Sequence, residues 1–147
     1  MGRPFAFIQP TPKQNQTTMS HFTTIKTQIR DIPSLTDACA DLDLTLAADS
    51  FCRGYAGVTR QATFVIKLKG PYDIAVDHSA EEKGTYDLSA DWWAGYVAKE
   101  VGAGFGRLLQ SYGVHRTIRA ARSRGLRTTR FIEADGSVLL TLEGGVL

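Results

Sequence analysis

Alternation of apolar and polar side chains predicts a series of short β-strands. Residues 21–30, 62–69 and 72–77 each alternate with a period of two, as half-buried strands do. Shorter strands are expected at Phe51–Tyr55 and at Thr85–Leu88. Tight turns and a polar loop join the strands from residue 62 onward, and this order is typical of an antiparallel meander.

Spacings of three and four residues between apolar side chains predict helices. The first runs from Pro33 to Asp43, and the carboxylate of Asp31 is available as its N-terminal cap. Residues 91–111 carry a longer apolar stripe and are expected to form one long helix, which their glycines weaken or split in two. Gly113 is expected to separate it from a further helix at Val114–Ser123.

The last strands predict a hairpin and complete the fold class. The segments Thr128–Glu133 and Ser137–Leu142 flank Ala134-Asp135-Gly136, a strong turn signal. Strands and helices do not alternate strictly, so we expect an α+β fold, a mostly antiparallel sheet with two or three helices packed on one face. A ferredoxin-like core, elaborated by the middle hairpin, fits this order.

The 147 residues are enough for one domain. Residues 1–18 contain three prolines and are expected to form a flexible N-terminal arm, the domain to span residues 19–142, and residues 143–147 to form a frayed tail.

Composition excludes several classes of protein. The chain is 43% hydrophobic and 22% charged, which argues against collagen-like, coiled-coil or wholly disordered chains. The absence of an apolar run of about 18 residues and of an export signal predicts a cytoplasmic protein without a membrane partner. In a reducing compartment the only two cysteines stay free; Cys39 lies on an apolar stripe and is expected in the core.

Charge is distributed unevenly along the chain, although the net charge is only +2. Between Val101 and Ile132 there is no carboxylate, and this segment carries seven arginines: Arg107, Arg116, Arg119, Arg122, Arg124, Arg127 and Arg130. The rest of the chain contains ten basic and fifteen acidic residues. Helical geometry turns Arg116 and Arg119 away from the apolar side of their helix, which exposes a basic face.

Three interpretations of this basic face remain open. It binds the carboxylates of a protein partner, it binds RNA or DNA through phosphates, or it pairs internally with Asp37, Asp41 and Asp43. Arg116, Arg119, Arg122 and Arg127 are the candidate binding residues. Trp92 and Trp93 point about 100° apart on a helix, so one is expected in the core and the other partly exposed. The exposed one either contributes to an interface beside the arginines or closes the edge of the sheet.

An enzymatic alternative depends on isolated polar residues. His21, Asp73, Asp91 and His115 form a catalytic or metal site only if the fold brings them together, because their spacing matches no ligand pattern. No Walker loop, nucleophile elbow or zinc-protease motif is present. We therefore expect a non-catalytic protein without a cofactor.

Short motifs in order along the chain resemble the hypothetical chloroplast reading frame thirty-five family of bacterial, cyanobacterial and plastid domains of unknown function. The matching segments are Met19–Thr27, Arg53–Tyr55, Tyr72–Ile74, Tyr86–Trp92, Leu108–His115 and Ala134–Leu142. The resemblance implies no catalytic residues. It implies a small companion protein, often encoded beside an AAA-type ATPase, and hence an adaptor or assembly partner.

Overall fold

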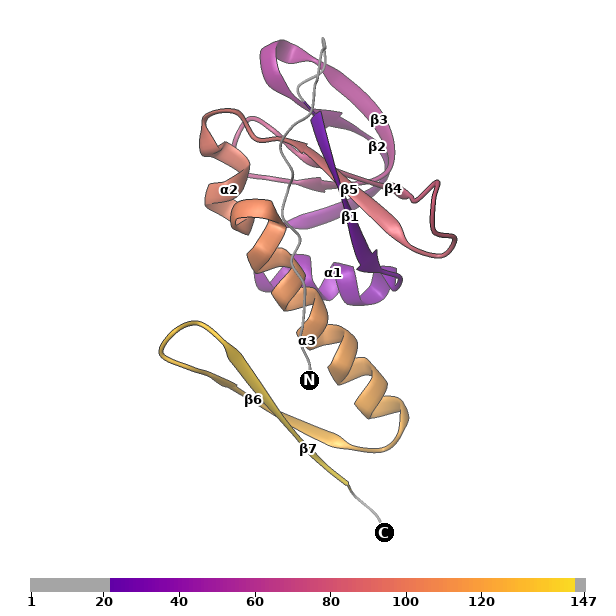
Figure 1. The fold of residues 1–147 in the computed structure, drawn as a ribbon, viewed down its shortest axis with the longest axis vertical. Helices are drawn as coiled ribbons and strands as arrows, with labels where there is room; N and C mark the ends of the chain where they lie inside the picture. The colour runs from indigo at the N-terminus through magenta and orange to yellow at the C-terminus, as the bar shows by residue number, and fades with distance from the viewer. Residues whose placement is uncertain (1–21, 145–147) are drawn as a thin grey trace.

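The computed structural model describes residues 22–144 and contains two separate sheets (Figure 1). The elements are β1 (Phe22–Ile29), α1 (Ile32–Asp41), β2 (Thr45–Arg53), β3 (Thr59–Lys67), β4 (Ile74–His78), β5 (Tyr86–Asp91), α2 (Tyr96–Val101), α3 (Gly106–Ser123), β6 (Arg127–Ile132) and β7 (Val138–Glu143). The α+β class with a mostly antiparallel sheet is therefore confirmed.

The larger sheet has the order β1-β5-β4-β3-β2, and every neighbouring pair is antiparallel. β1 and β2 lie at opposite edges, and α1 connects them. This topology differs from the expected ferredoxin-like core, in which a strand after the second helix returns to the sheet. Here β6 and β7 pair with each other instead, and they lie beyond α3 (Figure 1).

The main core lies between one face of the large sheet and the helices. Ile66, Ile74 and Leu88 from the sheet pack against Leu35 of α1 and Leu108 of α3, and all five side chains are fully buried. The helix entry at α1 follows the sequence prediction, because the Asp31 side chain accepts a hydrogen bond from the backbone N–H of Ser34. Within residues 22–144 no helix is long and apolar enough to cross a membrane.

The helix expected at residues 91–111 is split in two, which is one of the two outcomes that its glycines suggested, and its expected start at residue 91 is wrong. β5 continues to Asp91, a turn follows at Trp93–Gly95, and α2 ends at Val101 before α3 begins at Gly106. Two glycines cause the break between α2 and α3. Gly102 has φ 86° and Gly104 has φ 60°, and both values lie outside the right-handed helix. The apolar stripe nevertheless remains buried from Val97 onward.

Three further boundaries differ from the sequence prediction. Gly113 does not separate two helices, because α3 runs through it. The short strand expected at Phe51–Tyr55 is the end of the longer β2, and Tyr55–Gly57 is a tight turn in which Ala56 has φ 59°. Glu143 is the last residue of β7 and not part of a frayed tail. Residues 145–147 and the predicted arm at 1–18 lie outside the described residues.

Candidate functional site

The outward side of α3 carries the arginines that the sequence singled out. Arg116, Arg119 and Arg122 follow one another at intervals of three residues, so they are neighbours on the helix surface. All three are exposed because Leu108, Tyr112 and Ala121 occupy the buried side of the same helix. The basic helix face is therefore present as expected.

Two aspartates of α1 neutralise part of this face. Arg119 Nε lies 2.9 Å from Asp37 Oδ2, and Asp41 Oδ2 lies 3.3 Å from Arg130 Nη1 and 2.7 Å from His115 Nε2. Burial alone would raise the pKa of Asp41, but hydrogen bonds from His115 and Ser111 outweigh it and hold this pKa below its ordinary value. These contacts join α1 to α3 and to β6.

The remaining arginines fall into two groups. Arg107 donates to the carbonyl oxygen of Glu100 at 3.0 Å, and Arg127 lies 3.4 Å from Glu143. The side chains of Arg116, Arg122 and Arg124 form no ion pair or hydrogen bond with any residue of the described chain. The hydrogen bond from Ser34 lowers the pKa of Asp31, and the positive charges of Arg116 and Arg119 add to this effect.

An open cleft of about 590 Å³ lies between α1, α3 and β6 beside these arginines. We call it the arginine cleft; its charged and ionisable lining residues are Asp37, Asp41, His115, Arg119, Arg122 and Arg130. Three guanidinium groups face two carboxylates there, so an anion entering the cleft meets an excess of positive charge. Among the three, Arg122 is the one without an acceptor within residues 22–144, and a planar guanidinium suits a carboxylate or a phosphate.

The two tryptophans have the different environments that the sequence predicted, but neither adjoins the arginines. Trp92 packs on Phe105 with ring centroids 4.7 Å apart, whereas Trp93 is exposed and stacks on Tyr55 at 5.5 Å. Tyr72 and Tyr96 form a second aromatic pair at 5.4 Å. Trp93 precedes α2, at the other end of the helical layer from the C-terminal half of α3 (Figure 1).

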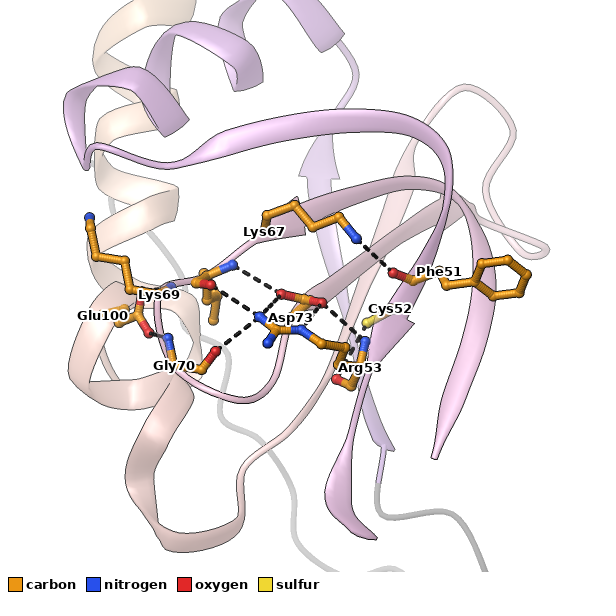
Figure 2. Close-up of polar contacts among 9 residues, drawn as sticks. Phe51, Cys52, Arg53, Lys67, Lys69, Gly70, Asp73 and Glu100 are labelled. Carbon is orange, nitrogen blue, oxygen red and sulfur yellow. Dashed lines mark hydrogen bonds and ion pairs between the residues drawn. The ribbon is translucent and has the colours of Figure 1, made fainter. Parts of the chain in front are cut away.

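Asp73 belongs to a polar cluster with a structural role (Figure 2). Its buried carboxylate accepts hydrogen bonds from Arg53 Nε at 2.8 Å and Nη2 at 2.7 Å, and from the backbone N–H groups of Arg53 and Leu68. The same Nη2 also donates to the carbonyl oxygens of Leu68 and Gly70. Asp73 therefore clamps the end of β2 to the chain between β3 and β4.

The four residues of the enzymatic alternative do not form one cluster where the structure describes them. Asp91 accepts hydrogen bonds from the backbone N–H groups of Tyr55 and Trp93, and His115 bonds to Asp41, whereas Asp73 bonds to Arg53. His21 lies outside the described residues. No group of three or more His, Cys, Asp or Glu side chains within residues 22–144 is arranged to hold a metal ion.

Both cysteines are buried on opposite sides of the large sheet. Cys39 is in the main core, as predicted, and Cys52 is in a smaller cluster with Val65 and Ala75. Burial raises the pKa of each thiol to about 12. A thiol with such a pKa is a poor nucleophile at neutral pH.

We therefore predict that neither thiol reacts with an aromatic disulfide reagent in the native protein, and that two thiols per chain react once urea unfolds it. The absorbance of the released chromophore measures this. Free cysteine at the same pH serves as the rate reference. A native thiol that reacts at the reference rate would contradict the buried placement.

One of three comparisons with known proteins finds a match. Residues 38–141 match the model of the family described as Protein of unknown function (DUF1257). This match covers most of the chain, which belongs to the DUF1257 family. No curated protein and no solved structure matches the chain.

Proposed function

We propose that this protein is a non-catalytic interaction or adaptor module that binds an acidic surface of a partner protein through α3 and the arginine cleft. Arg116, Arg119, Arg122 and Arg127 are the binding residues. The observation that carries the proposal is that Arg116 and Arg122 are exposed and unpaired within residues 22–144, beside arginines that α1 already neutralises.

Physical considerations favour carboxylates as the ligands of this surface. A guanidinium group is always charged and presents a rigid fork of N–H donors to a carboxylate. The long helix α3 is anchored through Leu108 and Tyr112, so its arginines are held on a rigid element. Asp37 shows, with its 2.9 Å contact to Arg119, the kind of contact that an acidic partner would make with Arg122.

The resemblance to the chloroplast reading frame thirty-five family supplies the first partner to test. Members of that family are often encoded beside an AAA-type ATPase, so an acidic surface of such an ATPase is the partner we propose. Nucleic acid is the alternative ligand for the same face, because phosphates accept hydrogen bonds from arginine as carboxylates do.

Charge reversal of the unpaired arginines tests this proposal. The double substitution Arg116→Glu/Arg122→Glu leaves the ion pairs of Arg119 and Arg130 in place, and we expect it to abolish recovery of acidic partners. The measurement is quantitative affinity capture from the native host, with mass spectrometry of the bound proteins and of cross-linked segments.

The matched control is Lys83→Glu/Lys99→Glu, which changes the net charge equally at exposed positions away from the arginine cleft. This variant should retain the partners. Equal recovery by wild type and the arginine variant would overturn the proposal. The alternative, nucleic-acid binding, is tested by fluorescence anisotropy with a labelled single-stranded RNA and a labelled DNA duplex at low and moderate salt. Binding that weakens steeply with salt and that requires Arg116 and Arg122 would favour nucleic acid.

A further inference from the structure

The ribbon of β6 and β7 is the least covered part of the described fold. It contains only two strands and rests with one face on α1 and α3 (Figure 1). Four of its apolar side chains are exposed, with exposed fractions of 54% for Phe131, 72% for Ile132, 49% for Leu139 and 50% for Leu142, whereas Val138 and Leu140 are partly buried. An isolated two-stranded ribbon is marginally stable in water, and each outer edge presents unpaired backbone groups.

The register shows which backbone groups point outward. The N–H of Glu133 donates to the carbonyl oxygen of Ser137 at 2.8 Å, so this is a hydrogen-bonded position of the ladder. Hydrogen-bonded positions alternate with non-bonded ones in an antiparallel pair. The N–H and C=O groups at the outer edge are therefore those of Val138, Leu140 and Leu142 on β7, and of Thr128, Arg130 and Ile132 on β6.

The two edges differ in their ability to pair with a second copy of themselves. Consider first a dimer in which β6 pairs with β6 of a second copy, and all outward N–H and C=O groups of β6 form hydrogen bonds. The two-fold axis then places Arg130 directly opposite the partner's Arg130. Like charges at directly opposite positions destabilise a strand pair, and basic side chains protect edges from association. The same axis through β7 places Leu140 opposite the partner's Leu140 and Val138 opposite the partner's Leu142.

We propose that this chain forms a two-fold dimer by antiparallel pairing of β7 with β7 of a second copy, which creates one four-stranded sheet. In this register all the outward N–H and C=O groups of Val138, Leu140 and Leu142 find partners. The side chains of these three residues lie on one face, so the two copies form a continuous apolar stripe.

Dimer formation would also place two arginine clefts on one assembly, because Thr128 and Arg130 of the same ribbon line the cleft. A two-fold axis perpendicular to the sheet keeps both clefts on the same face. The proposal does not depend on what the clefts bind. Pairing of one short strand buries less surface than a standard stable interface, so we expect a weak dimer that dissociates on dilution.

Site-specific cross-linking of the full chain tests the register. In Leu140→Cys the two introduced thiols face each other across the axis, at a Cα separation of about 5.5 Å for a hydrogen-bonded pair, which a disulfide can span. Mild oxidation should yield a covalent dimer on a non-reducing gel. Cys39 and Cys52 are buried and do not interfere. Ser137→Cys is the control, because Ser137 lies far from its own copy in this register.

Sedimentation equilibrium over a range of protein concentrations provides the second measurement. Wild type should shift from monomer to dimer as concentration rises, and Leu140→Lys, which opposes like charges at the axis, should remain monomeric with an unchanged circular dichroism spectrum. Three results would overturn the proposal: a wild type that is monomeric at every concentration, a dimer that persists in Leu140→Lys, or cross-linking of Ser137→Cys as fast as that of Leu140→Cys.

Discussion

Replacing Asp73 with alanine is expected to lower the free energy of unfolding by about 2–5 kcal/mol. The carboxylate is fully buried and accepts four hydrogen bonds, two from the Arg53 side chain and two from backbone N–H groups. Arg53 is partly exposed and can turn to water, so the main loss comes from the two backbone donors and from the vacated space. Urea denaturation followed by circular dichroism measures the change.

A surface ion pair provides the control for Asp73→Ala. Asp37→Ala removes the half-exposed partner of Arg119 and should lower the free energy of unfolding by about 1 kcal/mol or less, because solvent screens such pairs. Equal losses in the two variants would contradict the structural role of Asp73.

The pH dependence of stability gives a second readout for Asp73. Burial alone would raise the pKa of this carboxyl, but the hydrogen bonds from Arg53 and from the backbone hold it below its ordinary value. Because the folded state lowers this pKa, the stabilisation is present above the pKa of the unfolded chain and is lost as pH falls through the folded value. Asp73→Asn should therefore lose less stability than wild type on acidification.

Substituting Gly102 with alanine is expected to destabilise the protein by about 1–3 kcal/mol through backbone strain alone. Gly102 has φ 86° and ψ 156°, a region that residues with a Cβ atom avoid. An added Cβ would lie 2.8 Å from the backbone nitrogen of Arg107, so steric overlap increases the loss. The substitution would disturb the junction that directs α3 across the sheet, and thermal unfolding measures it.

Gly113 supplies a matched control within the same helical region. It lies inside α3, and an added Cβ would meet no atom within 4 Å beyond its chain neighbours and the adjoining backbone of the same helix. Gly113→Ala should therefore stabilise the protein by about 0.5–1 kcal/mol, because alanine favours the helix. A rise of the unfolding temperature in both variants would show that the break at Gly102 is placed wrongly.

Most strands and the amphipathic helices could be predicted because each leaves a local pattern. The alternation in residues 62–69 and the turn at Asp135-Gly136 correspond to β3 and to the β6–β7 hairpin. The break between α2 and α3 was less predictable: the apolar spacing continues through Gly102, and the buried side of Val101, Phe105 and Leu108 is the same in one helix or two. β2 was only partly recognised because its polar and small residues, from Ala47 to Ser50, obscure alternation.

The candidate site also has one feature that a local pattern predicts and others that depend on distant residues. The exposed row at Arg116, Arg119 and Arg122 could be predicted from helical spacing. Which of these arginines is neutralised depends on Asp37, a residue of another helix, about eighty positions away. The exposed pair of Tyr55 and Trp93 was missed for a similar reason, because two turns distant in the sequence bring it together.

The amino-acid sequence by itself determined the secondary-structure types, the α+β class and the charge of the outward side of α3. These depend on periodicity and on residues close together in the chain. Only the tertiary structure decided the strand order, the clamp between Asp73 and Arg53, the partial neutralisation of the arginines and the separate ribbon of β6 and β7. Such features depend on contacts between distant segments, whose energies no local pattern records.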